Sequence, residues 1–536
     1  MNSDPSGDYT GAPFFKPGGL SGRKPKQQRL QLIIAVAAVP VIIFFHFLKW
    51  KTAEIYGDDL HMYFTHEGLT SLWNKLNLPV FYGKFRPVHG VITHILIAIF
   101  NKHTGAYFLF NIAIQSLNTV LFAMLVNLLL QSPFLSLLLG MLIGLSRFAF
   151  FNVTQFFNGG SLEGLALTFF LIALFFIIRV LLLHSTVSRK QRDLIWAFVA
   201  ANLSLYTHER YIVLIPFMIL LILLYPGLRV FSAKQKLIFS LIGIASIALN
   251  IALKKYVYGM PFLVGTGGVN ISLSFSSILT YFTEGFLSIF QVNYGPEYLI
   301  GIKYTALPVF DKILVWALLG SFVIILALYI IRIRKAFLSK QKDEIAVFII
   351  FLSLSVLFFI FLIPAIITIR LEQRWLQASF AVFILMIGLA WSRLPLKNKR
   401  TRTLAMAAFV LAFSLVNFSY LQNGDKYMYL VNAGHIAGSF KQAINNGTIP
   451  ASAGKLYIRE DEDSKVVTNW ALQGGLFFKF YQDKPKEVVF IDSTFKLNTA
   501  QDPDTLKERV LNFNDAVTDI TNRYLKAPMP DSVLRK

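Results

Sequence analysis

Long apolar stretches alternate with short polar ones over the first 420 residues of the chain. The apolar stretches are roughly 17–25 residues long, enough for a helix to cross a hydrocarbon core about 30 Å thick. The pattern therefore predicts a polytopic α-helical membrane protein. We expect eleven transmembrane helices, at residues 30–49, 105–130, 134–151, 161–183, 193–207, 211–226, 237–256, 311–332, 345–368, 375–391 and 402–421.

The composition agrees with this class. Hydrophobic residues make up 55% of the chain, charged residues only 15%, and the mean hydropathy is +0.57. A soluble domain is far less apolar. The chain has no cysteine, which excludes disulfides, thiolate metal sites and cysteine nucleophiles.

The formal net charge of +22 does not indicate nucleic-acid binding. From residue 421 onward the chain has 15 Lys and Arg against 14 Asp and Glu, so that segment is balanced. The excess lies before it, with 36 basic and 15 acidic residues, and mostly in short loops between spans. Positive charge retained on the cytoplasmic side of a membrane accounts for this distribution.

The basic loops also orient the chain. With the basic tail 1–29 in the cytoplasm and the first span as an uncleaved anchor, the four most basic loops fall on the same side. Two loops, 51–104 and 257–310, and the C-terminal segment 422–536 are then extracytoplasmic. The basic loops lie at 188–193, 229–236, 332–342 and 393–402.

Two regions outside the spans carry their own patterns. FRPVHGVITHILIAIF at 85–100 is short and has Pro87 where a helix would begin, so we expect a helix lying in the outer interface. Beyond residue 421, KLYIR (Lys455–Arg459) and EVVFI (Glu487–Ile491) look like strands, with helical sequence at 466–481 between them. The segment 422–536 is therefore predicted to form a small α/β domain.

Charged residues gather where the threading places span ends at the outer face. Such charges are costly to desolvate unless they are paired or used, so their clustering indicates a functional site. They are Asp58 and Asp59 in GDD, Arg86 in FRPV, Glu163 in NGGSLEG, Glu209 in THER, and Arg370, Glu372 and Arg374 in IRLEQRW.

Carboxylates and arginines together at a bilayer edge indicate a particular substrate chemistry. A carboxylate can deprotonate a hydroxyl nucleophile or hold a divalent cation. Arginine binds phosphate through a planar fork of donors. A lipid-linked phosphate sugar would suit both groups, with its tail in the membrane, its sugar at the water face and its phosphate as the leaving group.

The order of first span, GDD loop, FRPV helix and later spans resembles membrane glycosyltransferases of the GT-C fold. It is most similar to the protein O-mannosyltransferase, aminoarabinose-transferase and TPR-containing mannosyltransferase branches. Those enzymes have an acidic pair in the first external loop, an Arg-Pro soon after it, and an Arg-bearing segment before a late span. The resemblance covers roughly residues 30–420, and 422–536 lacks the helical-hairpin repeats of the TPR branch.

The resemblance implies roles for single residues. Asp58 would be the general base for the acceptor hydroxyl, and Asp59 would orient it or contribute to a cation site, so a divalent metal is one option. Arg86 and Arg374 would hold the donor phosphate. Glu163, Glu209 and Arg370 would support the acceptor side. The implied reaction is transfer of the sugar with inversion. The compact loops and the lack of a eukaryotic retention signal favour a bacterial plasma membrane.

Other interpretations remain open from the sequence alone. The chain could be a transporter or flippase of lipid-linked sugars, although transporters place charges near mid-membrane. It could also be a polymerase or ligase of surface polysaccharide. For the residues themselves, the aspartate pair could simply cap the next helix, Arg86 could extend to lipid headgroups, and Arg370 and Glu372 could form a purely structural cluster.

Overall fold

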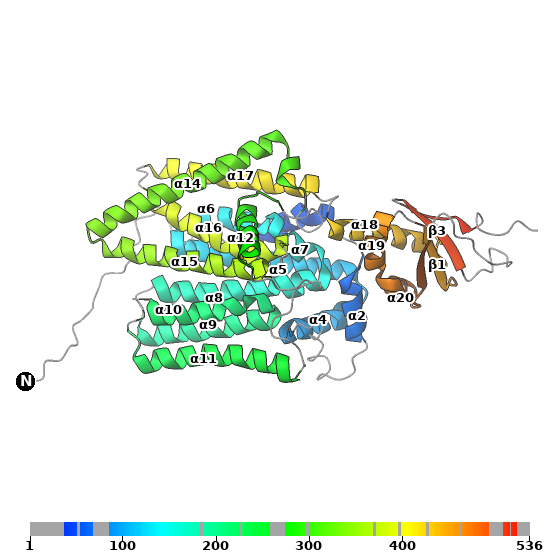
Figure 1. Cartoon of the computed structure of the whole chain (residues 1–536), viewed down its shortest axis with the longest axis horizontal. Coiled ribbons are helices and arrows are strands. Elements are labelled where there is room, and N and C mark those ends of the chain that lie inside the picture. The colour runs from blue at the N-terminus through cyan, green and yellow to red at the C-terminus, as the bar shows by residue number, and fades with distance from the viewer. Residues whose placement is uncertain are drawn as a thin grey trace, which may run out of the picture.

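The computed structural model shows a bundle of long helices that run along the longest axis of the molecule, with a small sheet beyond one end (Figure 1). The apolar stretches of the sequence form these helices, and the balanced C-terminal segment contributes the sheet. The structure describes residues 37–50, 54–67, 85–182, 186–225, 228, 230–257, 274–294, 301–367, 371–394, 398–424, 428–459, 462–491, 508–514 and 516–521.

Seven helices are long and apolar enough to cross a membrane within the described residues, and a bent pair would make eight. The bent pair is α6 (Pro133–Gly144) with η3 and α7 (Arg147–Thr154), which meet at 52°. The seven are α5 (Thr104–Leu130), η4 with α8 (Phe156–Gly164, Leu165–Leu182), α11 with η7 (Ala233–Ala252, Leu253–Val257), α14 (Val309–Leu338), α15 (Lys342–Ile367), η10 with α16 (Gln373–Leu376, Gln377–Ser392) and α17 (Lys399–Gly424).

Two of the eleven expected spans do not meet that test, and a third is described only in part. Expected span 193–207 lies in α9 (Val187–Thr207), whose first two turns contain Arg189, Lys190, Arg192 and Asp193. Span 211–226 contains only the 11 residues of α10 (Leu214–Leu224), because a 3-10 segment, η5 (Glu209–Val213), precedes it. The described part of span 30–49 belongs to a 14-residue helix over 37–50 that ends in η1 (Leu48–Trp50). The structure therefore supports seven or eight of the expected spans within the described residues.

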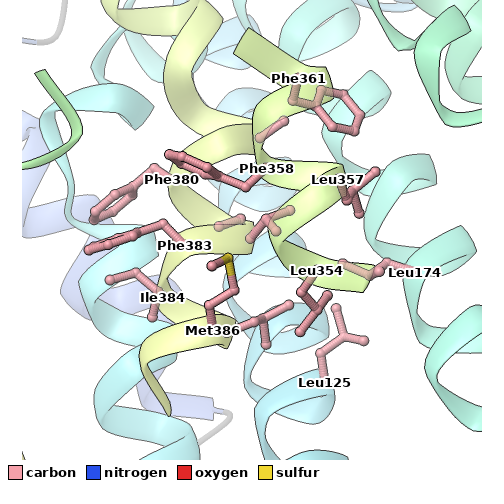
Figure 2. Close-up of a cluster of buried hydrophobic side chains, with 14 of the residues drawn as sticks. Leu125, Leu174, Leu354, Leu357, Phe358, Phe361, Phe380, Phe383, Ile384 and Met386 are labelled. Carbon is pink, nitrogen blue, oxygen red and sulfur yellow. The ribbon is translucent and has the colours of Figure 1, made fainter. Parts of the chain in front are cut away.

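The core of the bundle lies around α16, which is buried along nearly its whole length. Helix α15 packs along α16, and α5 and α8 lie against the same cluster of apolar side chains (Figure 2). Phe rings fill much of it, for example Phe383 at 4.8 Å from Phe290 and 6.2 Å from Phe358 between ring centroids. Ring pairs of this kind add to the stabilisation from buried area.

The outer surface of the bundle is apolar. On α14, Ile313, Trp316, Val323 and Ile330 are all more than half exposed, and α11 and α17 show the same pattern. Such a surface is unfavourable in water and suits lipid. The chain is a multi-pass membrane protein.

One end of the bundle carries the shorter helices α2 (Asp58–Glu67) and α4 (Pro87–Phe100) (Figure 1). Two other short elements, α12 (Phe275–Ile289) and η9 (Tyr304–Ala306), precede α14, and α12 packs against α15. Helix α4 is the helix expected at 85–100, with Pro87 at its start. It buries His89 and Thr93 and exposes Ile95 and Ile99. This polar-inward, apolar-outward arrangement is the one expected for a helix in contact with lipid.

The C-terminal unit packs on this end of the bundle (Figure 1). It confirms the two expected strands, β1 (Lys455–Arg459) and β2 (Glu487–Ile491), which pair in parallel. The sheet is mixed, in the order β2-β1-β3-β4, with β3 parallel to β1 and antiparallel to β4. The remaining elements are α18 (Tyr429–Asn445), α19 (Glu462–Leu472), η12 (Gln473–Gly475), α20 (Leu476–Gln482), β3 (Glu508–Asn514) and β4 (Ala516–Asp519).

Candidate active site

The paired aspartates begin helix α2 immediately after a turn at Gly57. The φ angle of Gly57 is +60°, which glycine adopts without strain, and a Cβ at this position would lie 2.5 Å from the ring of Trp470. Asp58 and Asp59 then occupy the first turn of the helix, where negative charge is favourable. Their side chains have different surroundings, because Asp58 is partly exposed and Asp59 is buried.

Asp59 binds the start of the π-helix η4. Its Oδ2 accepts the backbone N–H of Phe156 at 2.9 Å, and its Oδ1 accepts those of Phe157 and Asn158 at 3.1 and 3.3 Å. The side chain is 1% exposed, and this burial raises the pKa of Asp59 to about 7, although the three N–H donors oppose the shift. These contacts give Asp59 a structural function that needs no catalytic step.

The raised pKa of Asp59 leads to a prediction about stability. In the unfolded chain this carboxyl titrates near pH 4, so between about pH 4 and pH 7 the folded state holds a proton that the unfolded state has lost. Its contribution to the free energy of unfolding should therefore fall with rising pH, by at most about 1.4 kcal/mol per pH unit. Thermal unfolding of the purified protein at pH 5 and pH 8 measures this change.

The Asp59→Asn variant should flatten that pH dependence, since the amide does not titrate. Asp483 offers a control. This carboxylate of the C-terminal unit is exposed and pairs with Lys102, which follows α4, at 2.6 Å. The Asp483→Asn variant should keep the parent's fall in stability between pH 5 and pH 8. An unchanged pH dependence in Asp59→Asn would contradict the assignment of the titration to Asp59.

The π-helix η4 also holds Glu163, near its other end. The helix passes so close to α5 that a Cβ on Gly160 would lie 1.8 Å from Oδ1 of Asn111. Glu163 is 3% exposed, and its Oε1 lies 3.3 Å from Nη2 of Arg210 and 3.7 Å from Nε of Arg374. The charge of Glu163 is thus paired with two arginines, as a buried charge requires.

His208 lies between Glu163 and the arginines. The backbone N–H of Arg210 donates to its Nδ1 at 3.2 Å, which leaves the ring proton on Nε2, 3.4 Å from Oε1 of Glu163. Burial, together with the nearby Arg210 and Arg86, holds the pKa of His208 well below its ordinary value. The ring is therefore neutral at physiological pH and acts as a polar spacer in the cluster.

Arg86 stands directly before helix α4 and faces the same cluster. Its Nη2 lies 3.5 Å from Nε2 of His208, and its buried Nε has no hydrogen-bond partner in the described part of the chain. Burial lowers the pKa of Arg86 to about 10, so the guanidinium stays charged at neutral pH. None of the described carboxylates lies within ion-pair distance of it. Among the arginines of the described cluster, Arg86 is thus the one whose charge is not neutralised by an ion pair, so it could bind an anionic ligand.

Glu209 fixes the backbone next to Arg86. Its Oε1 accepts the N–H of Phe85 at 2.8 Å, and its Oε2 pairs with Nζ of Lys254 at the same distance. This carboxylate therefore ties the start of α4 to the end of α11 and η7. The expectation that Glu209 supports the acceptor side stays a prediction.

Arg374 is more fully engaged than Arg86. Its Nε lies 2.5 Å from Oε2 of Glu372, and its guanidinium stacks on Phe151 at 4.0 Å from the ring centroid. Arg210 stacks in the same way on Trp375, at 4.6 Å. Arg370, expected beside them, lies outside the described residues. The expectation that Arg374 contacts a donor phosphate stays a prediction.

The described cluster carries a net positive charge. Four basic side chains face three carboxylates, and His208 is neutral, so the formal sum is +1. A partly buried excess cation is stabilised by a bound anion. The basic members are Arg86, Arg210, Arg374 and Lys254, and the acidic members are Glu163, Glu209 and Glu372.

A cavity of about 350 Å³ opens on the other side of the GDD turn, between α18 and the segment that precedes the turn. Its walls include Glu54, Tyr56, Thr154 and Gln442, so hydroxyl, amide and carboxylate groups lie beside aromatic surface. Gly438 of α18 lines it, and a Cβ there would meet no heavy atom within 4 Å. The cavity can take a neutral ligand rich in hydroxyl groups.

No three His, Asp or Glu side chains converge as metal ligands within the described ranges. The contact of His89 is with the backbone: its Nε2 lies 3.1 Å from the carbonyl oxygen of Phe157. The two oxygens of Asp59 are occupied by backbone N–H groups. The sequence expectation that the aspartate pair can hold a divalent cation stays untested.

Several members of the site were not assigned a function from the sequence. Arg210 and His208 belong to the THER motif, where the sequence suggested Arg210 only as a possible interface partner of Glu209; in the structure Arg210 pairs with Glu163 and Glu209 with Lys254. Lys254 and Trp470 carried no signal, because their contacts with Glu209 and Asp58 join residues 45 and 412 positions apart. Only the charge of Lys254 at the end of a span could have drawn attention to it.

Helix bundle, polar cluster and attached sheet together define a polytopic membrane protein with a buried charged site at one end. No family model and no curated protein matches the chain. Among solved structures the chain is similar to the crystal structure of ArnT from Cupriavidus metallidurans in the apo state. That match has a TM-score of 0.43 and 11% sequence identity and covers 86% of each chain.

Proposed function

We propose that this protein is a membrane glycosyltransferase that moves a sugar from a polyprenyl-phosphate donor to an acceptor hydroxyl. The observation that carries the proposal is that a partly exposed carboxylate, Asp58, lies at the same end of the bundle as a cluster of net positive charge that includes Arg86. Helix α2, which begins with Asp58, packs against both η4 and α4, the two elements that position Glu163 and Arg86.

The two parts of the site suit the two ends of one displacement. Asp58 accepts the proton of the acceptor hydroxyl, whose oxygen forms a bond to the anomeric carbon of the sugar. The bond from that carbon to the phosphate oxygen breaks, and the polyprenyl phosphate leaves with the bonding electrons. Arg86 stabilises the negative charge that grows on the phosphate. A single displacement of this kind inverts the anomeric carbon.

The cavity beside α18 provides space for the acceptor. It is separated from the arginine cluster by α7, since Phe150 lines the cavity while its neighbour Phe151 stacks on Arg374. Donor phosphate and acceptor would then approach Asp58 from opposite sides. The lining favours a glycan or glycolipid headgroup, because aromatic faces and hydrogen-bonding groups both bind sugars.

Filling this cavity should impair use of the acceptor but not of the donor. In Gly438→Leu the new side chain enters the cavity, and its Cβ meets no heavy atom within 4 Å. We expect the KM for an alkyl glycoside acceptor to rise roughly tenfold or more, because steric overlap of this size costs about 1–3 kcal/mol. Donor hydrolysis by water should continue, since water still fits.

Gly105→Leu is the matched control. Gly105 is also a helical glycine with no heavy atom near its would-be Cβ, but it does not line the cavity. Its variant should keep the parent's ratio of transfer to hydrolysis. If Gly438→Leu also kept that ratio across a panel of alkyl glycosides, the cavity would not be the acceptor site.

The proposed reaction is tested with purified protein and polyprenyl-phosphate sugars. The protein in detergent should release polyprenyl phosphate from at least one labelled donor and attach the sugar to a hydroxyl acceptor. A transporter or flippase would instead move the intact donor across the bilayer of a liposome. Movement without cleavage of the sugar–phosphate bond would overturn the proposal.

The cellular setting follows from the sequence. We propose that residues 30–421 form the catalytic membrane part, in eleven spans, and that 422–536 and the site face the outside of a bacterial plasma membrane. The basic tail 1–29 and the four basic loops would lie in the cytoplasm. Lipids, the lipid-linked donor and an acceptor protein, lipid or glycan are the expected partners.

A further inference from the structure

The C-terminal unit contacts the GDD turn through helix α19, which lies beside the start of α2 (Figure 1). The indole Nε1–H of Trp470 donates to Oδ1 of Asp58 at 3.1 Å. The backbone N–H of Gly57 donates to the carbonyl oxygen of Ala471, also at 3.1 Å. Two adjacent residues of the C-terminal unit thus bind two adjacent residues of the turn.

The indole ring is held in place on several sides. Its centroid lies 5.9 Å from that of Tyr56, edge to face, and 5.2 Å from that of Tyr429. The missing side chain of Gly57 makes room for it, since a Cβ there would lie 2.5 Å from the ring. An indole with this packing has little freedom to turn its N–H away from Asp58.

We infer that Trp470 is a positioning residue of the proposed reaction, and that the C-terminal unit thereby completes the active site. The inference rests on the function proposed above for Asp58. An N–H donated to one carboxylate oxygen fixes the plane of the carboxylate and leaves the other oxygen to accept the hydroxyl proton. A hydrogen bond to an ionised acceptor is also among the stronger ones.

The position of this donor explains why it comes from a separate unit. The bond to Oδ1 comes from Trp470 of α19, and α19 belongs to the C-terminal unit rather than to the helix that carries Asp58. The contact therefore makes a competent Asp58 depend on a docked C-terminal unit. A bundle without that contact would keep the charged cluster around Glu163 but not the fixed carboxylate.

The first test distinguishes the effect of the indole hydrogen bond from the effect of the packing of the ring. In Trp470→Phe the aromatic packing is largely kept and the hydrogen bond is lost. We expect kcat for sugar transfer to fall roughly 10-fold to 100-fold, as for loss of a hydrogen bond to a charged group, while the donor KM stays near the parent value. Trp391→Phe is the control, because the Nε1–H of Trp391 makes a bond of the same 3.1 Å length to the carbonyl of Arg402, at the far end of α16. Its variant should keep the parent kcat.

The second test observes the contact without any reaction. With ¹⁵N-labelled tryptophan, the indole N–H signal that disappears in Trp470→Phe belongs to Trp470. In Asp58→Asn this signal should shift, because an amide oxygen is a weaker acceptor than a carboxylate, while the signal of Trp391 should not. The two tests together distinguish a positioning role from simple packing of the ring.

The outcomes are separable. If Trp470→Phe transfers sugar at the parent rate and the Trp470 signal ignores Asp58→Asn, the inference is overturned while the proposed function stands. If the signal responds but the parent protein cleaves no polyprenyl-phosphate donor, the proposed function fails, and the positioning role fails with it.

Discussion

Asp58→Asn should slow sugar transfer about 10²–10⁴-fold, the usual contribution of a general base, while leaving donor binding largely intact. The amide keeps the shape of the side chain, and its oxygen can still accept the indole N–H of Trp470. It cannot take the proton of the acceptor hydroxyl. Turnover of a polyprenyl-phosphate sugar and equilibrium binding of the same donor, measured side by side in parent and variant, separate the two effects.

Asp483→Asn is the control for that experiment. Asp483 is an exposed carboxylate on the same end of the molecule, paired with Lys102 and remote from the arginine cluster. Its variant should transfer at the parent rate. Repeating both assays with a chelator shows whether the aspartate pair uses a divalent cation. If Asp58→Asn folds, binds donor and turns over like the parent, Asp58 is not the base.

Arg86→Ala should weaken use of the donor, with a fall in kcat/KM for the donor of roughly 10- to 100-fold. The reason is that a charge-assisted bond to phosphate, typically about 1.5–3 kcal/mol, is lost in a poorly solvated site. Arg86 has no carboxylate at ion-pair distance among the described residues, so its removal leaves no buried anion behind. The KM for the acceptor should change little by comparison.

Arg86→Lys should restore the donor kcat/KM only in part, because lysine supplies charge without the two-pronged donor geometry. Arg393→Ala is a suitable control, since Arg393 pairs with Glu344 at 3.5 Å near the opposite end of the bundle. It should leave the donor kcat/KM unchanged. Full donor use by Arg86→Ala would show that Arg86 does not hold the donor phosphate.

The fold could be predicted from the sequence where a single property, the apolar pattern, determines an element. Long apolar stretches mark α5, α14 and α17, and short runs rich in β-branched and aromatic residues mark β1 and β2. The prediction was weaker for α9 and α10, because their apolar windows are interrupted by charges or shortened by a 3-10 turn. Apolar content alone does not show whether such helices cross a membrane or pack beside those that do.

The site was predictable only as a set of charges. The sequence singled out Asp58, Asp59, Arg86 and Glu163, because charges at span ends are rare and costly. It did not separate their functions, since these depend on contacts across hundreds of residues. Asp59 was expected to act with Asp58, but its two oxygens bind the backbone of η4. The pairing of Asp59 with the start of η4 could not be predicted, because the two segments lie about 97 residues apart in the sequence.

The π-helical geometry of η4 also limits how this segment can change in length. A π-helix of this kind is an α-helix with an inserted residue, frequently found at functional sites. Asp59 is bound at the first residues of η4, and Glu163 lies near its last. Deletion of one residue between them would restore α-helical winding and rotate one end against the other by about 100°. Either the Asp59 contacts or the Glu163 contacts would then be lost, so the number of residues in this stretch is fixed by the two ends that it connects.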